Sequence, residues 1–177
     1  DGELFIEGLA ATTLAEKYGT PLYVISESRI REQYGKIYKA INAHYDKVRV
    51  YYSAKANTNL SILKILASEG AYLDIVSAGE FYLAQKAGFA RDKLLFTGTN
   101  ITNEELQLLM QAGVIINVDS LSLLNRLLAY SVPEWLSFRV NPEVGAGHHA
   151  HVITAGKKSK FGLWERDVVS AYKAALQ

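Results

Sequence analysis

From residue 48 onward, the sequence alternates short apolar runs with helical segments, and a new apolar run begins about every 20 residues. This spacing indicates a strand, a crossover helix and a parallel strand, repeated along the chain. Runs rich in β-branched or aromatic residues predict strands at 22–26, 48–53, 72–76, 94–97, 114–118 and 135–140. Apolar residues at helical spacing lie between them, as at Ile62, Leu63 and Leu66 and at Leu106, Leu109 and Met110.

Helix start and stop signals support these boundaries. Three Ser/Thr-x-x-Glu sequences have the form of a capping box, in which each side chain satisfies a free backbone N–H of the first turn. They are Thr13 with Glu16, Ser77 with Glu80, and Thr102 with Glu105. Glycines stand where a helix would end in a residue that tolerates positive φ, at Gly19, Gly70, Gly88 and Gly113.

Five strand–helix units, the last one cut short, fit either an open doubly wound sheet or part of an eight-stranded (β/α) barrel. No G-x-G-x-x-G sequence follows the early strands, and the Gly-Ala-Gly at 145–147 stands in a loop. The sequence therefore predicts an α/β chain that forms a partial (β/α)8 TIM barrel.

The two ends of the chain predict its domain organisation. Residues 3–8 alternate like a lone strand, which is not stable unpaired, so we assign residues 1–20, this strand and a short helix, to a second β domain that is mostly absent. Residues 21–177 form the first part of the barrel. Because the chain starts at Asp1 and the helix predicted at 165–177 stops without a C-cap, we expect a fragment.

Composition and charge narrow the class of function. The 19 Lys and Arg balance 18 Asp and Glu, for a net charge of +1, and no basic block suggests binding to nucleic acid or to an anionic membrane. The absence of cysteine excludes disulfides, thiolate catalysis and Cys-ligated zinc. No apolar run has the length of a membrane span. We expect a cytoplasmic protein that acts on a small molecule.

Polar residues follow the predicted strands, at the edge where barrel enzymes place their functional groups. They are Lys55, Ser77, Thr97, Asp119, Arg139 and Asn141. Lys55, beside the small Ala54 and Ala56, delivers an amine at a strand tip, where desolvation would make it a nucleophile able to form a Schiff base. The alternative is a lysine that only marks the end of a buried strand.

Asp74 lies inside a predicted buried strand, where an ionised carboxylate needs a partner, so we expect a cation nearby. Period-two alternation puts Tyr72, Asp74 and Val76 on one face, so Asp74 points toward Lys55 or a cofactor nitrogen, or forms a structural ion pair. Arg139 either holds an anion or carboxylate or braces the barrel interior.

Three histidines, His148, His149 and His151, stand close together between residues 140 and 161. Neither a downstream histidine nor a set of carboxylates completes a metal site, so we predict no metal there. The surrounding loop of about twenty residues predicts a lid or a substrate-contacting segment, because such long loops inside a compact domain are usually functional.

Several motifs occur together in one order: GTPLYVIS at 19–26, YYSAKAN at 51–57, DIVSAGE at 74–80, NVDS at 117–120, RVNP at 139–142 and HVITAGKKSKFG at 151–162. In this order they resemble the diaminopimelate decarboxylases, which belong to the alanine-racemase-like, fold-type III pyridoxal-phosphate-dependent decarboxylases. The loop at 141–162 favours these over related decarboxylases. Ala155 departs from the family's usual Gly-Gly pair.

The resemblance implies a barrel of the alanine racemase type with pyridoxal 5'-phosphate as cofactor, held by Lys55 as a Schiff base. By the same resemblance, Ala54, Asp74 and Arg139 are cofactor-binding residues. His149, His151 and Ser159 then belong to the substrate loop, and Lys160 lies at the interface of a homodimer with shared active sites.

The implied reaction is decarboxylation of meso-2,6-diaminopimelate to L-lysine and CO₂, a carboxy-lyase step of lysine biosynthesis. Alternatives are an ornithine- or arginine-type basic amino-acid decarboxylase, a non-catalytic pyridoxal-phosphate-binding homologue, and a cofactor-free Schiff-base aldolase on the same barrel. We expect residues 1–177 alone to bind the cofactor weakly and to be inactive, since a half barrel leaves sheet edges open.

Overall fold

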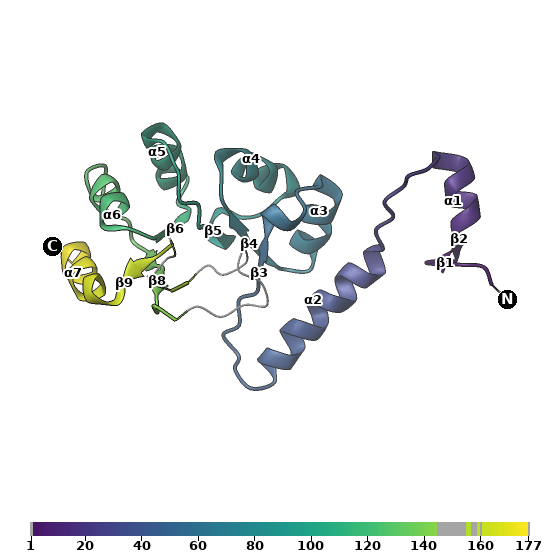
Figure 1. Cartoon of the computed structure of the whole chain (residues 1–177), viewed down its shortest axis with the longest axis horizontal. Coiled ribbons are helices and arrows are strands. Elements are labelled where there is room, and N and C mark those ends of the chain that lie inside the picture. Colours follow the sequence, from purple (N-terminus) through teal and green to yellow (C-terminus); the bar gives the residue numbers. More distant parts are fainter. Residues whose placement is uncertain (1, 145–154, 157–158, 160, 177) are drawn as a thin grey trace.

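The computed structural model describes residues 2–144, 155–156, 159 and 161–176 of the chain (Figure 1). At the N-terminus, β1 (Phe5–Ile6) and β2 (Leu9–Ala10) form an antiparallel hairpin, so the segment predicted as a lone strand pairs locally. Glu7 and Gly8 connect the strands with φ of 50° and 79°. Positive φ at both central residues is typical of the tight turns that match the twist of a hairpin.

Helix α1 (Ala11–Tyr18) begins directly after this hairpin. The capping box predicted from Thr13 and Glu16 is wrong, because Thr13 lies inside the helix and Ala10 is its N-cap. The backbone N–H of Ala11 donates instead to the carbonyl of Leu4, 2.8 Å away. A backbone group of the hairpin segment thus satisfies the first helical donor, and no side-chain cap is needed.

The strand predicted at 22–26 is also not formed. This apolar segment is exposed, with 98% of Tyr23 accessible, and no strand of the described chain pairs with it. The composition favours an extended chain, but a strand also needs a neighbour to bond with.

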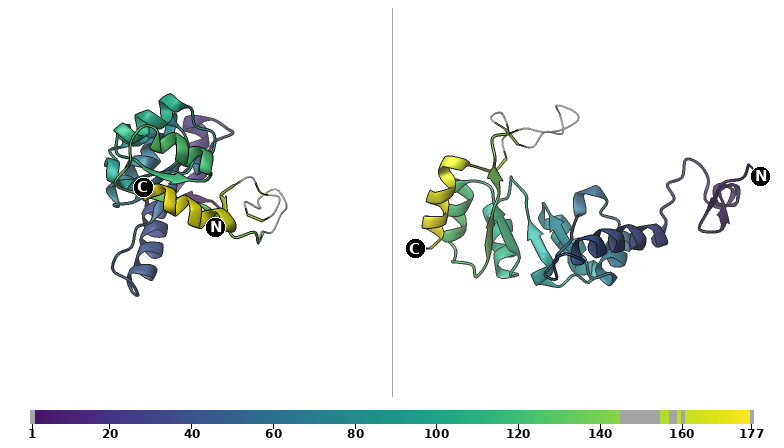
Figure 2. Two further views of the ribbon diagram at one scale, coloured as in Figure 1. Left: turned by 90° about the vertical axis from the view of Figure 1, so that its left-hand side faces the viewer. Right: turned by 90° about the horizontal axis from the view of Figure 1, so that it is seen from below.

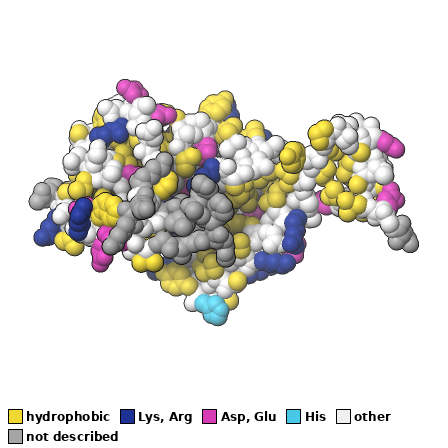
Figure 3. Space-filling model, viewed as in Figure 1, with side chains coloured by type: hydrophobic (Ala, Val, Ile, Leu, Met, Phe, Trp, Pro, Cys, Tyr) yellow, Lys and Arg dark blue, Asp and Glu magenta, His cyan; other side chains and the backbone are white. Residues whose placement is uncertain are grey.

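Helix α2 (Glu27–Asn42) follows, capped by the Ser26 hydroxyl, which accepts from Arg29 N at 3.0 Å. Figures 2 and 3 show this N-terminal part extending away from the sheet, with apolar side chains on its surface.

The central sheet contains five parallel strands in sequential order. They are β3 (Tyr51–Ser53), β4 (Tyr72–Ile75), β5 (Leu94–Phe96), β6 (Ile115–Val118) and β7 (Leu136–Phe138). The crossover helices α3 (Leu60–Ser68), α4 (Ala78–Ala87), α5 (Asn103–Gln111) and α6 (Leu121–Leu128) lie on one face of the sheet (Figure 1). A doubly wound sheet would reverse its strand order and carry helices on both faces. The predicted partial barrel is therefore confirmed.

The barrel wall continues beyond β7. The Arg139 N–H donates to the Val118 carbonyl at 2.8 Å, and the Arg139 carbonyl accepts from Leu163 N at 2.7 Å. Strand β8 (Val140–Asn141) pairs in parallel with β9 (Leu163–Trp164), and α7 (Glu165–Ala175) packs against α6, which confirms the last predicted helix. Gly162 precedes β9 with φ of 84°, and a Cβ there would lie 2.9 Å from Asn141 N, so only glycine fits.

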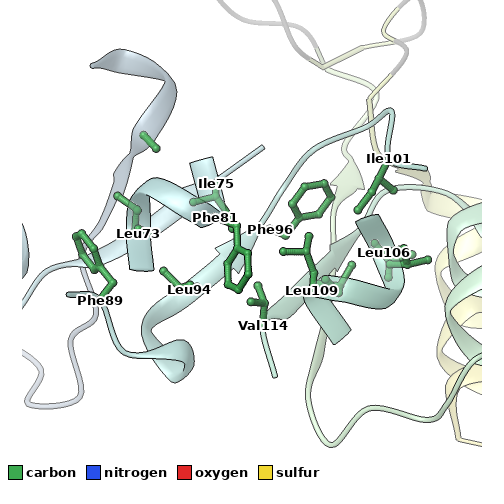
Figure 4. Close-up of a cluster of buried hydrophobic side chains, with 14 of the residues drawn as sticks. Leu73, Ile75, Phe81, Phe89, Leu94, Phe96, Ile101, Leu106, Leu109 and Val114 are labelled. Carbon is green, nitrogen blue, oxygen red and sulfur yellow. The ribbon is translucent and has the colours of Figure 1, made fainter. Parts of the chain in front are cut away.

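The core lies between the sheet and its helices. Strand side chains alternate, and the fully buried set from β4 to β6 is Leu73, Ile75, Leu94, Phe96, Ile116 and Val118. These pack against buried leucines of the helices, among them Leu106 and Leu109 (Figure 4). The residues between them in each strand are half-buried on the opposite face. The structure thus separates a dry helix-facing side from a side on which polar groups can lie.

Short connections end the helices as the sequence predicts. Thr102 and Glu105 form the full capping box of α5, whereas Ser77 caps α4 and Glu80 accepts from Val76 N at 2.8 Å. The glycines predicted at helix ends all have positive φ; they are Gly19, Gly70, Gly88 and Gly113. Short 3₁₀ turns, η1 (Ala54–Ala56) and η2 (Arg91–Lys93), flank β3 and β5. No helix in the described chain has both the length and the apolar character needed to cross a membrane.

Candidate functional site

The carboxyl edge of the sheet gathers the polar residues that the sequence singled out. Lys55 follows β3 in η1, Asp74 lies in β4, Thr97 follows β5, Asp119 follows β6 and Arg139 follows β7. Because the five strands are parallel and sequential, their carboxyl ends meet at this edge. In (β/α) barrels this edge carries the active site.

The backbone turn formed by the residues next to Lys55 fixes the position of Lys55. Ala54 is fully buried, and its carbonyl accepts from Asn57 N at 3.1 Å, which closes the turn. The Lys55 side chain is exposed. The described residues thus leave the Lys55 side chain accessible to solvent rather than desolvated. An exposed amine on a fixed turn remains accessible to a carbonyl compound.

Asp74 is half-buried and accepts hydrogen bonds on both carboxylate oxygens. Ser53 Oγ donates to Oδ2 at 2.8 Å, and Thr97 Oγ1 donates to Oδ1 at 2.6 Å. The predicted face is confirmed, since Tyr72, Asp74 and Val76 are half-buried while the residues between them are buried. The expected cation partner is not found among the described residues, because two hydroxyls solvate the carboxylate instead.

Sequence reasoning missed this pair of donors. Ser53 lies directly opposite Asp74 in the register of β3 and β4, and Thr97 extends the pairing of β4 and β5 through its N–H to the Ile75 carbonyl at 2.9 Å. The available signal is a hydroxyl residue at the end of β3, Ser53, and another directly after β5, Thr97. The strand ends do not reveal it without the register.

Asp119 and Arg139 form a second polar group at the edge. Burial raises the pKa of the Asp119 carboxyl above its ordinary value, while the Ser120 hydroxyl and the positive charge of Arg139 oppose the shift. The Arg139 guanidinium carbon lies 4.5 Å from the centre of the Phe161 ring. Stacking on a ring uses no in-plane N–H donor, so the guanidinium keeps the donor geometry that suits an anion.

Two residues shape the chain between β8 and β9. Buried Asn141 accepts through Oδ1 from Glu143 N at 3.0 Å and from Gly156 N at 2.9 Å, and its Nδ2 donates to the Gly156 carbonyl at 3.2 Å. Ser159 is half-buried, and its hydroxyl accepts from Phe161 N at 3.2 Å. Asn141 therefore holds the departing and returning chain together, and Ser159 orients the segment that carries Phe161.

Three predicted residues lie outside the described part of the chain. They are His149 and His151 of the substrate loop and Lys160 of the dimer interface. Their assignments stay predictions, as does a contact of Ser159 with substrate.

A cavity of about 460 Å³ lies at the opposite edge of the sheet, lined among others by Arg49, Tyr72 and Trp135. These residues stand at the amino ends of β3, β4 and β7, away from Lys55 and Arg139. Residues at the amino-terminal face of a barrel serve stability rather than chemistry as a rule. The candidate site is thus the carboxyl edge.

The family described as "Pyridoxal-dependent decarboxylase, pyridoxal binding domain" matches residues 27–177. The chain belongs to this family, and the resemblance found in its motifs is confirmed.

Two individual relatives are diaminopimelate decarboxylases. The chain is 52% identical, over 99% of its length, to the diaminopimelate decarboxylase of Methanothermobacter thermautotrophicus, and 38% identical, again over 99%, to that of Pseudomonas fluorescens. It spans 41% and 43% of the lengths of these two relatives.

Solved structures of decarboxylases are also similar to this chain. The diaminopimelate decarboxylase of M. jannaschii in complex with L-lysine superposes with a TM-score of 0.86 at 36% identity, covering all of this chain and 43% of that one. An arginine decarboxylase of a Paramecium bursaria Chlorella virus, 22% identical with a TM-score of 0.69 over 84% of this chain and 39% of its own, shares the fold.

Proposed function

We propose that the full-length protein is a pyridoxal-phosphate-dependent decarboxylase that converts meso-2,6-diaminopimelate to L-lysine and CO₂. The observation that carries this proposal is the 52% identity, over 99% of the chain, to a diaminopimelate decarboxylase. The arrangement of Lys55, Asp74 and Arg139 along one sheet edge supports it, since this edge is where a barrel holds a cofactor.

The donor set at this edge fits pyridoxal phosphate. When bound, the cofactor supplies an electron sink that stabilises the negative charge left on the substrate's α-carbon after CO₂ leaves. Lys55 is the residue that would hold it covalently, because its exposed side chain carries a primary amine on a fixed turn. Ala54 would contribute by its small side chain, fully buried beneath the site.

Asp74 and Arg139 would orient the bound groups by charge. The Asp74 carboxylate presents a negative charge that the two hydroxyls stabilise without neutralising. Arg139, held on Phe161, presents planar N–H donors to an anionic group. Residues of both signs along the same sheet edge can thus hold a ligand that itself carries both charges, as amino acids do.

The remaining assignments belong to the same proposal. His149, His151 and Ser159 would contact the substrate, and Lys160 would pair across a homodimer. Residues 1–20 would belong to a second β domain, and residues 21–177 to the barrel. The enzyme would be cytoplasmic and would bind neither nucleic acid nor membranes. The net charge of +1, without a basic block, supports the absence of such binding.

Borohydride reduction of the full-length protein, followed by mass measurement and peptide mapping, tests the cofactor. We expect a phosphopyridoxyl group on Lys55 that Lys55→Ala removes and that Lys64→Ala, an exposed lysine of α3, leaves in place. An unmodified Lys55 in the reduced wild-type protein contradicts the proposal.

Release of CO₂ from four separate amino acids tests the substrate. We expect turnover of meso-2,6-diaminopimelate and none of L-ornithine, L-arginine or L-lysine. Turnover of ornithine or arginine alone would reject this substrate and retain the reaction class. A protein that carries the cofactor and decarboxylates none of the four is a non-catalytic homologue.

A further inference from the structure

The N-terminal end of helix α2 is capped by two separate parts of the chain. Ser26, the N-cap residue, accepts through Oγ from Arg29 N at 3.0 Å. Glu7, in the turn of the N-terminal hairpin, accepts through Oε1 from Ser28 N at 2.8 Å and from Ser28 Oγ at 2.6 Å. The Ser26 hydroxyl donates to the same oxygen of Glu7. A carboxylate that lies 19 residues before the N-cap thus completes the cap of this helix.

The chemistry of both groups favours this contact. The first turn of a helix has free backbone N–H groups and a partial positive charge, which together stabilise a carboxylate. Hydrogen bonds from Ser26 and Ser28 lower the pKa of the Glu7 carboxyl and keep it ionised at neutral pH. The turn itself does not call for glutamate, since positive φ, here 50°, favours glycine, asparagine or aspartate. The contact with α2 therefore accounts for a glutamate at this position.

The hairpin and α1 lie beyond the N-terminal end of α2, away from the sheet (Figures 1 and 2). Their backbone is bonded locally, as where Ala11 N donates to the Leu4 carbonyl at 2.8 Å. The apolar side chains at 22–25 are exposed, and no strand of the described chain pairs with this segment. In the part of the chain that the structure describes, the hydrogen bonds that join residues 2–20 to α2 and its N-cap all end on Glu7 Oε1.

Helix α2 is in turn bound to the barrel through α3. Arg31, near the start of α2, donates to Ser68 Oγ at 3.0 Å and forms an ion pair with Glu69, the C-cap residue of α3. Tyr34, one turn further along α2, packs against the hydrophobic core. Contacts in series, first at Glu7 and then along α2, therefore connect the hairpin to the barrel.

We propose that Glu7 attaches the N-terminal hairpin to the barrel, because its carboxylate serves as a second cap of helix α2. Loss of this carboxylate frees the hairpin and α1 from α2 and leaves the barrel packed. The attachment also fixes how the exposed apolar residues of the hairpin segment, among them Leu4, Phe5 and Leu9, lie relative to the barrel. The inference rests on these contacts alone and does not depend on the proposed function.

Hydrogen–deuterium exchange of the full-length protein, resolved to single backbone amides by mass spectrometry, tests the attachment. Two amides report on it: the Ser28 N–H, which Glu7 binds, and the Ala11 N–H, which bonds within the hairpin segment. A hairpin of two-residue strands is marginally stable by itself, so its amides should exchange faster once it is detached. We expect Glu7→Ala to speed exchange at both amides by about threefold or more.

Matched variants separate the attachment from a general loss of structure. Glu16→Ala removes an exposed glutamate of α1 and should leave both amides as in the wild-type protein. Glu7→Gln retains the length of the side chain without its charge and should give a smaller effect than Glu7→Ala. Exchange in the core strands β4 to β6 should stay unchanged in all three variants. Faster exchange there in Glu7→Ala would show a general loss of stability and contradict a local attachment.

Two further results would overturn the inference. Unchanged exchange at Ser28 in Glu7→Ala would show that Glu7 does not cap α2 in the full-length protein. Faster exchange at Ser28 with unchanged exchange at Ala11 would make Glu7 a cap that does not hold the hairpin. Because the measurement needs neither cofactor nor substrate, either result leaves the proposed function intact. An unmodified Lys55 after borohydride reduction rejects the proposed function and leaves the attachment intact.

Discussion

Asn141 is a buried polar side chain whose hydrogen-bond partners within the described part of the chain are backbone groups of Glu143 and Gly156. Asn141→Leu would leave these groups without a partner, and each unpaired buried group costs roughly 1–3 kcal/mol. We expect the free energy of unfolding of the full-length protein to fall by about 3 kcal/mol. Urea denaturation measures this, with Asn125→Leu, an exposed position on α6, as the control. An equal effect in both variants contradicts the role of Asn141.

The Asp119 carboxyl leads to a second prediction at the scale of a single residue, about how folding stability depends on pH. Its pKa is raised from 3.8, mainly by burial. The unfolded chain then releases this proton at lower pH than the folded chain, so ionisation of Asp119 lowers stability as the pH rises through the folded pKa. Asp119→Asn removes this loss, which solvent screening limits to roughly a few tenths of a kcal/mol.

Urea denaturation at two pH values checks the sign of this effect. The stability of Asp119→Asn relative to wild type should be greater at pH 7 than below the unfolded value of 3.8. Asp46→Asn, at an exposed position, is the matched control. A relative stability that decreases toward pH 7 shows that attraction to Arg139 outweighs burial.

At the scale of an element, the sequence predicts a capping box only as well as it locates the helix start. Thr102 and Glu105 form the complete box of α5, whereas the same pattern at Thr13 and Glu16 lies within α1. Thr102→Ala should therefore lower the free energy of unfolding by about 1 kcal/mol, and Thr13→Ala by less than about half of that. Urea denaturation of both variants compares two identical motifs in different contexts, and equal losses would show that context does not matter.

The strands show the same dependence on context. Alternating apolar residues predict β4 and its buried face, and the structure confirms both. The similar run at 22–26 forms no strand, because pairing is a property of two segments. Ser53 and Thr97 become partners of Asp74 through the parallel register, which sequence spacing alone does not specify.

At the scale of the whole molecule, the repeated spacing predicts parallel strand–helix units, each packed against the next one along the chain. The absence of a G-x-G-x-x-G sequence then favours a partial barrel over a doubly wound sheet. Among the described residues, the structure shows neither the cation expected for Asp74 nor burial of the Lys55 side chain. Both depend on what surrounds a side chain in three dimensions. Local pattern thus predicts the scaffold, and contacts between units determine the electrostatics of the site.

The exposed segment at 22–25 leads to the last prediction. Its four apolar residues are 40–98% accessible, and contiguous exposed apolar surface favours association. We expect residues 1–177, expressed alone, to self-associate, and the double variant Val24→Thr, Ile25→Thr to associate less. Sedimentation velocity at several concentrations measures this, with Tyr130→Ser as the control, since Tyr130 is exposed at the end of α6. If the double variant associates as strongly as the wild-type chain, the association uses another surface, such as the open edge of the sheet at β3.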